Sequence, residues 1–572
     1  EAVFLMVGRR ADGILPSNIS PEEFQFHRVQ ADKRAKAWRG DRKTIEDIYS
    51  ELQSSLQTSK ENIGQLMEIE LAVEKEVLYP VPAICEAICG IRDGGGLIVF
   101  TSDMYLPSAF LKQVLAKKNI WQDGDNIIVS CEHGMLKSGG HLFRPMLEAV
   151  NGKASTTTHV GNCKYADVKG ARQAGLRSVH FQDGNLTRYE EVLGQFAPQT
   201  RNLTGLFAGA SQYARLETSV TSGRERAIRD VTAGVMAPVL TGFVLWILRQ
   251  SQKKTLDRLY FTSRDGYFLV PLARKLVDAL GLSCKVRYLF LSRAALAQAN
   301  PDPEVLHRTM EFETGSGQAV LARFGIDIDD IPRDTLADEE RKQLQTAPLG
   351  THSRKMVAAL IADIGSRSSI DSAFRQQRQL LSDYLRQEGL AGATEAGFVD
   401  LGWKGTVHSQ LSNVLMGEGM VRQPTQGFFF GLVSNQQRHS SYRQAYFFDE
   451  YRETGVKNAL APGSAIYTLM ETFCTAPHGT VSGYEKTEGT VEATLEPSWA
   501  DRMNAWGLPV VERTLHAFGE GLMQQPGLLN QRVDTRASSA TLMRTFWESP
   551  TREEAAAWGD FPREIGQANE QH

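Results

Sequence analysis

The chain has 572 residues, which is longer than one hydrophobic core usually serves and indicates roughly two to four domains. Its formal net charge of −4 lacks the basic excess of most nucleic-acid-binding proteins and argues against nucleic acid as a partner. An apolar content of 42% is typical of a globular protein in water.

The cysteines indicate a reducing compartment. They are scattered, and no two form a CxxC pair or a metal-finger spacing. The first residues show no charged segment followed by an apolar one, as a secretory signal would. We therefore predict a cytoplasmic protein with buried, reduced thiols at Cys85, Cys89, Cys131, Cys163, Cys284 and Cys474.

Residues 1–79 have a polar, helical pattern. Ser20 is an N-cap signal in front of Pro21, and further helices are expected over residues 44–56 and 62–77.

Residues 80–183 alternate between strand and helix, which favours a parallel sheet covered by helices. The expected strands are 97–100, 126–130, 158–160 and 177–181, and the expected helices are 82–90, 108–117, 142–150 and 167–174.

Polar residues follow three of these strands. Ser102, or its neighbour Thr101, comes after the first, Lys137 follows the second, and Asn162 and Asp167 follow the third. Because ligands bind at the carboxyl ends of parallel strands, we expect these side chains at one edge of the sheet. A hydroxyl and a lysine suit phosphate, and oxygen ligands suit Mg²⁺.

Residues 184–204 are polar and are predicted to be a linker, and residues 205–572 form a second, larger α/β domain. Helix is expected near residues 215–250. Within it, the uncharged run Val231–Leu248 is barely long enough to span a bilayer and is interrupted by Gly234 and Pro238, so a buried core helix is the favoured interpretation over a membrane span.

The second domain returns to α/β order. Residues 259–269 and 397–408 each predict a strand, a turn and a helix, residues 286–293 and 427–432 predict strands, and residues 303–388 and the tail from Trp499 predict helices.

The strand ends of this domain carry a second set of candidate residues. A glycine turn before a helix exposes N–H groups to phosphate, and nearby charges would add to the binding of a ligand. The alternative is that Arg264 and Asp265 cap their own turn and that Asp400 pairs with Lys404. The candidates are Arg264, Asp265, Arg293, Asp400, Lys404 and Thr406.

The motifs Ser-Asp-Met-Tyr-Leu-Pro at residues 102–107 and Asp-Val-Lys-Gly-Ala-Arg-Gln-Ala-Gly at residues 167–175 resemble the haloacid dehalogenase (HAD) superfamily, in particular its large bacterial members associated with surface polysaccharides. The resemblance implies a HAD-like Rossmannoid core at 80–183, with residues 1–79 as its helical cap. The alternative for residues 1–79 is a helical bundle that merely pads the core.

The same resemblance implies a Mg²⁺-dependent phosphatase acting on a phosphorylated small molecule such as a sugar phosphate. Ser102 and Lys137 would stabilise the phosphoryl group, and Asp167 and Asn162 would bind Mg²⁺. Ser102 itself is not expected to be a nucleophile, because the Gly-x-Ser-x-Gly elbow of serine hydrolases is absent.

Two departures from the family pattern limit this expectation. The Asp-x-Asp motif that supplies the nucleophile is not found before Leu97, and residues 1–10 look like the helix that follows it, so we expect a truncated chain that is inactive by itself. Asn162 stands where the family has Asp, and the loss of one negative charge should weaken Mg²⁺ binding.

Two other functions stay open. In the first, the protein is a non-catalytic module that binds a phosphorylated or nucleotide-linked sugar for a partner glycosyltransferase. In the second, the C-terminal domain is a transferase that uses Asp265 or Asp400. The histidines are interpreted as surface or core residues, because no His-x-x-x-His or His/Cys group occurs: His27, His133, His141 and His159.

Overall fold

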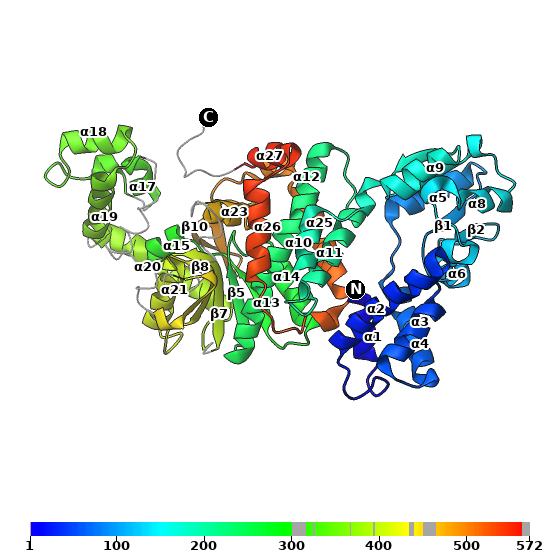
Figure 1. Cartoon of the computed structure of the whole chain (residues 1–572). Helices are drawn as coiled ribbons and strands as arrows, with labels where there is room; N and C mark the ends of the chain where they lie inside the picture. Colours follow the sequence, from blue (N-terminus) through cyan, green and yellow to red (C-terminus); the bar gives the residue numbers. More distant parts are fainter. Residues whose placement is uncertain are drawn as a thin grey trace. The chain divides into compact units, whose positions relative to one another are not determined.

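The structure is a computed structural model that describes residues 2–299, 316–323, 326–365, 368–392, 395–433, 440–449 and 465–562. The protein is a mixed α/β chain with parallel sheets, as predicted (Figure 1). It divides into two compact units. Unit 1 is Glu1–Gly194 with Gln212–Ser219, and unit 2 is Gln195–Ser211 with Val220–His572.

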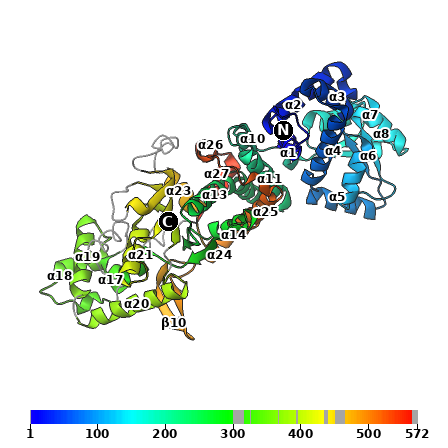
Figure 2. The ribbon, with the colours of Figure 1, turned by 90° about the horizontal axis from the view of Figure 1, so that it is seen from below.

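Unit 1 begins with a group of packed helices, visible together in Figure 2. They are α1 (Ala2–Arg10), α2 (Pro21–Arg39), α3 (Ile45–Leu56) and α4 (Lys60–Val77), close to the predicted bounds. The Ser20 signal is a capping box, in which the Ser20 side chain accepts from the N–H of Glu23 and the Glu23 carboxylate accepts from the N–H of Ser20. Apolar residues at helical spacing in α3, including Ile48 and Leu52, are buried in the shared core.

A fully buried ion pair joins α2 to α4. The Arg28 Nη2 atom lies 2.6 Å from Oε1 of Glu70, and its Nε atom donates to Oε2 at 2.8 Å. The Tyr49 hydroxyl donates to the same carboxylate at 2.8 Å. Both charged side chains are 0% exposed, so each needs the other to offset the loss of hydration.

The α/β part of unit 1 follows the predicted order. Its strands are β1 (Val99–Ser102), β2 (Asn126–Val129), β3 (Thr158–Gly161) and β4 (Arg177–His180). Its helices are α5 (Pro82–Asp93), α6 (Ser108–Lys117), α7 (Ser130–His133), α8 (Phe143–Ala149), the π-helix η4 (Lys164–Lys169), α9 (Gly170–Gln173) and α10 (Arg188–Gln195). Helix α10 lies inside the interval predicted as a linker.

The first strand begins two residues later than the sequence predicted. Leu97, the expected start, is 69% exposed, because the chain enters from the glycines at 94–96 and joins β2 only from Val99 onward. Ser102 is therefore the last residue of the strand rather than part of the turn after it.

The four strands form two separate parallel pairs, β1 with β2 and β3 with β4, rather than the single sheet that the sequence predicted. Side chains of both halves nevertheless share one core, since Ile128 of β2 packs with Ala171 of α9 and with Val99 of β1. No hydrogen bonds join β1 to β3 in the described part of the chain, so each keeps an unpaired edge.

Unit 2 is built on a five-stranded sheet in which all neighbours are parallel, in the order β6-β5-β7-β8-β9. The strands are β5 (Arg258–Thr262), β6 (Lys285–Leu289), β7 (Ala396–Trp403), β8 (Gln426–Leu432) and β9 (Arg443–Phe448). The sequence predicted all but β9. The antiparallel hairpin of β10 (Val481–Thr487) and β11 (Thr490–Leu495) was also not predicted.

Helices cover this sheet (Figure 1). On one face, α15 (Arg293–Ala299), α20 (Ser368–Gln387) and α21 (Thr406–Gly417) pack with the β10–β11 hairpin around Tyr260 and Phe398. Other helices in the described part of unit 2 are α12 (Gly223–Val231), η6 (Thr232–Met236), α13 (Ala237–Lys253), α14 (Leu269–Ala279), α17 (Gly317–Arg323), α18 (Asp338–Thr346), α19 (Thr351–Gly365), α23 (Ala465–Phe473), α24 (Ala500–Trp506), α25 (Leu508–Met523), α26 (Arg536–Glu548) and α27 (Arg552–Gly559). Helix α11 (Leu203–Glu217) belongs partly to each unit. Of the region 303–388, predicted to be helical, residues 303–315, 324–325 and 366–367 lie outside the described residues.

The apolar run Val231–Leu248 lies in the long helix Gly223–Lys253. Among the described residues this helix alone has the length and composition to cross a membrane, and 94% of its apolar window is buried inside the protein. This degree of burial is typical of a core helix, which is what the sequence predicted for this run.

We expect Glu70→Gln to destabilise unit 1 by about 3–5 kcal/mol, because it leaves the guanidinium of Arg28 buried without a counter-charge. Urea unfolding followed by circular dichroism measures the change. The matched control is Glu76→Gln, which breaks the exposed pair with Arg10 (46% and 42% exposed) and should cost less than about 1 kcal/mol. Equal effects of the two substitutions would contradict this account.

Candidate functional site

The carboxyl ends of β1 and β3 are linked through Lys137. Its Nζ atom lies 2.6 Å from Oδ1 of Asp167, and its backbone N–H donates to Oδ1 of Asp103 at 3.1 Å. Asp103 is the next residue after Ser102. The structure thus joins the predicted residues Lys137 and Asp167 directly, and Asp103, the chain neighbour of Ser102, binds the backbone of Lys137.

Asp167 is the most constrained residue of this site. Its Oδ1 atom also contacts Nε2 of His159 at 2.9 Å, and its Oδ2 atom accepts from the N–H of Cys163 at 2.8 Å. Burial alone would raise the pKa of this carboxyl, but the hydrogen bonds from His159 and Lys137 outweigh it and hold the pKa well below its usual range. Asp167 is therefore ionised at neutral pH.

Two glycines permit this close packing. A Cβ atom on Gly161 would stand 2.3 Å from Cγ of Asp167, and one on Gly170 would stand 2.0 Å from the carbonyl oxygen of Lys137. Asp167 itself lies in a π-helix, a form that often occurs at functional sites.

Asn162 does not face Asp167. Its side-chain Nδ2 donates to Oδ1 of Asn185 at 3.0 Å, and its carbonyl oxygen accepts from Nδ2 of Asn185 at 3.1 Å. The amide thus ties the end of β3 to the segment after β4.

The described residues alone do not fit a Mg²⁺ site. Both oxygens of Asp167 are engaged, its charge is neutralised by Lys137, and the Asn162 amide is bound elsewhere. Within the described ranges, no group of three or more His, Cys, Asp or Glu residues is placed to hold a metal. Octahedral Mg²⁺ would need further carboxylates.

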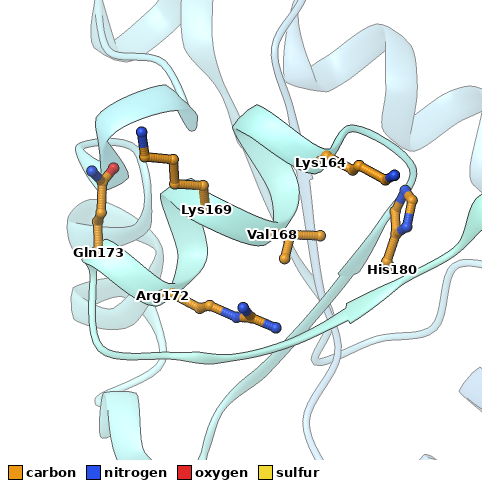
Figure 3. Close-up of a pocket in the computed structure, with 6 residues that line it drawn as sticks. All are labelled: Lys164, Val168, Lys169, Arg172, Gln173 and His180. Carbon is orange, nitrogen blue, oxygen red and sulfur yellow. The ribbon is translucent and has the colours of Figure 1, made fainter.

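A basic pocket of about 500 Å³ is lined by η4, α9 and the end of β4, shown in Figure 3. Lys164, Val168 and Arg172 come from one face of this helical segment, and the pocket extends to His180 at the end of β4. Its lining contains three cationic side chains and a histidine but no carboxylate: Lys164, Val168, Lys169, Arg172, Gln173 and His180.

In unit 2 the candidate residues gather at the topological switch point of the sheet. Strand β5 lies between β6 and β7, so the chain turns to one side of β5 to form β6 and then crosses to its other side to form β7. Ligands of open parallel sheets bind where the strand order reverses in this way. Asp265 follows β5 and Asp400 lies near the end of β7. Both side chains are half-buried.

These two carboxyl groups are hydrogen-bonded to each other, and Oδ2 of Asp265 accepts from the N–H of Leu401 at 3.2 Å. Burial and the neighbouring charge of Asp400 raise the pKa of Asp265 well above its usual range. The protonated form of Asp265 is therefore favoured, with a shared proton between the two carboxyl groups.

Arg264 connects this site to the segment before the β10–β11 hairpin. Its φ of 68° is in the left-handed region, and its backbone N–H donates to the hydroxyl of Tyr288 at 2.7 Å. That hydroxyl contacts Nε2 of His478 at 2.7 Å, whereas Nδ1 of His478 lies 2.9 Å from the carbonyl oxygen of Gly479. Nδ1 thus carries the proton, and Tyr288 donates to Nε2. Burial and Arg264 lower the pKa of His478, which is consistent with a neutral ring.

The remaining candidates lie near the ends of β6 and β7. Lys404 and Thr406 are half-buried in the turn that leads from β7 into α21, and Arg293 is exposed at the start of α15. The turn is fixed by Arg443, which donates to the carbonyl oxygen of Gly405 at 2.8 Å.

Sequence reasoning missed the residues that complete both sites. Asp103 follows Ser102 directly and was quoted only as part of a motif, while His159 was interpreted as a plain surface or core histidine. No sequence pattern pointed to three further residues of unit 2, Tyr288, Arg443 and His478. They come from β6, from β9 and from the segment before the hairpin, which are far from Asp265 in sequence.

Comparison with protein-family models and with curated proteins found no match to this chain.

We expect Asp265→Asn to flatten the pH dependence of the stability of unit 2. A carboxyl whose pKa is raised on folding loses stability as pH rises above its unfolded value of about 3.9, and the amide removes this titration. Urea midpoints at pH 5 to pH 8 should therefore fall less in the variant than in the wild type. Asp257→Asn, at an exposed site, is the control; if it behaves like Asp265→Asn, the explanation is wrong.

Proposed function

We propose that unit 1 handles a phosphomonoester in the manner of a HAD-type phosphatase. The observation that carries the proposal is the link that Lys137 makes between Asp103 and Asp167 at the ends of β1 and β3. A lysine beside a hydroxyl-bearing strand end suits the oxygens of a phosphoryl group. Ser102 is available for this role, since its hydroxyl makes no hydrogen bond to another described residue.

The unpaired edges of β1 and β3 support the further proposal that one more parallel strand belongs between them. Such a strand would merge the two pairs into one sheet and bring its carboxyl end to Ser102 and Lys137. A carboxylate there would attack phosphorus and form a P–O bond while the ester P–O bond breaks. A second carboxyl would protonate the leaving oxygen, and water would then release inorganic phosphate.

Magnesium would bind only if the inserted strand contributes ligands. Asp167 would be one ligand, and carboxylates of the inserted strand would have to supply the rest, because the described residues do not suffice. The phosphorylated substrate would be a small molecule such as a sugar phosphate. We also propose that the protein is cytoplasmic and takes part in polysaccharide synthesis.

The test compares the chain of residues 1–572 with one that also carries whatever is encoded before Glu1. With Mg²⁺ and a panel of sugar phosphates, we expect no turnover from the former and measurable phosphate release from the latter. In the extended chain Lys137→Met should lower kcat by about 10²–10³-fold, as the loss of one stabilising donor does. Lys153→Met, at an exposed position of the same unit, should leave kcat unchanged.

An extended chain that binds sugar phosphate but releases no phosphate would contradict the phosphatase. It would instead support a module that binds a phosphorylated or nucleotide-linked sugar for a partner glycosyltransferase. The neutralised Asp167 and the Asn162 amide bound to Asn185 favour this second function.

A transferase in unit 2 is the third candidate, and the proton held between Asp265 and Asp400 favours it, because such pairs serve as general acid and base. Activity lost on Asp400→Ala but kept on Asp167→Ala would place the chemistry in unit 2.

A further inference from the structure

Unit 2 contains a cavity of about 470 Å³, whose lining includes none of the candidate residues of the switch point. Its walls come from the last turns of α13, from β9 and from the segment in front of α26. Helices α13 and α26 run side by side in Figure 1. A cavity of this size is in the range that small organic ligands occupy.

The cavity carries an excess of positive charge. Arg249, Lys253, Arg532 and Arg536 line it, with Asp534 as the one carboxylate among the lining residues. Asp534 is already bound by Arg536, whose Nε lies 2.9 Å from both carboxylate oxygens. Arg249, Lys253 and Arg532 have no carboxylate within ion-pair distance in the part of the chain that the structure describes.

Arg249 differs from three other arginines that are withdrawn from water. Arg28, Arg215 and Arg229 are buried, and each pairs with a carboxylate, of Glu70, Glu190 and Asp230 respectively. The guanidinium of Arg249 instead donates to the backbone carbonyl oxygens of Val533, at 3.0 Å, and of Gln531. Burial and the charge of Arg532 lower the pKa of Arg249, so the two guanidinium groups repel each other.

An anion in the cavity would remove this repulsion, and the wall beside the arginines suits an organic group. The indole of Trp246 and the ring of Tyr446 line the same space, and the Tyr446 hydroxyl is fixed by Thr535 Oγ1 at 3.0 Å. Gly242 allows this approach, since a Cβ there would stand 2.6 Å from that hydroxyl of Thr535.

We propose that this cavity binds the diphosphate group of a small organic ligand, with Arg249, Arg532 and Lys253 contacting the phosphates and Trp246 contacting the organic part. Arginine forks match phosphate oxygens in geometry as well as in charge. A diphosphate rather than a monophosphate fits three unpaired cations. The inference does not depend on the phosphatase proposed for unit 1.

The test is calorimetric titration of the chain of residues 1–572 with pyrophosphate at low salt. We expect Arg532→Gln to bind pyrophosphate about tenfold more weakly than the wild type, and the double variant with Lys253→Gln to bind it about tenfold more weakly again. The wild type should bind inorganic phosphate more weakly than pyrophosphate. Arg532 and Lys253 are exposed, so these substitutions should not disturb folding. Arg249 is kept because it holds two carbonyl groups of the chain.

Arg544→Gln, at an exposed position of α26, is the matched control and should bind pyrophosphate like the wild type. A Lys137→Met variant separates this cavity from the site in unit 1. Pyrophosphate binding that is lost in Lys137→Met but unchanged in Arg532→Gln would overturn the inference. The absence of binding, or equal affinity for inorganic phosphate and pyrophosphate, would do the same.

Discussion

The ion pair between Lys137 and Asp167 is the contact on which the site of unit 1 depends. It connects the loop after β2 to the π-helix after β3, and so holds the ends of two strand pairs together although no strand hydrogen bonds join them. The same contact limits the site, because the lysine that would receive a phosphoryl group already neutralises a carboxylate. A phosphate that binds there must share Lys137 with Asp167, and this competition couples ligand binding to the arrangement of both strand ends.

The two units use carboxylates in opposite ways. In unit 1, hydrogen bonds from Lys137 and His159 keep Asp167 ionised in spite of its burial. In unit 2, Asp265 has another carboxyl group as its neighbour, and burial favours the neutral form. The first arrangement suits the binding of charged groups, and the second favours a shared proton at the point where a doubly wound sheet binds its ligands.

Buried arginines also depend on their neighbours to stabilise the charged form. A guanidinium withdrawn from water is stabilised by a carboxylate in the pairs of Arg28 with Glu70 and of Arg215 with Glu190, where both partners are almost fully buried. Among the described residues, the hydrogen-bond partners of Arg249 are carbonyl oxygens, which accept its hydrogen bonds without offsetting its charge. The cavity in front of it is for that reason a better candidate for an anion than a basic patch on the open surface, where water and salt screen each charge.

The sequence by itself determined most of the local structure. The capping signal at Ser20, helical patterns along residues 1–79, and short apolar runs between turns predicted the helices and most of the strands, because these signals depend on near neighbours. It also predicted that Lys137 and Asp167 lie at strand ends. Only the tertiary structure decided that the strands of unit 1 form two pairs and that Asp265 meets Asp400. It alone showed that His159, Tyr288 and His478 belong to the sites and that Arg249 has no carboxylate partner within the described ranges. The physical reason is that strand pairing and charge compensation join residues far apart in the chain, which no local pattern records.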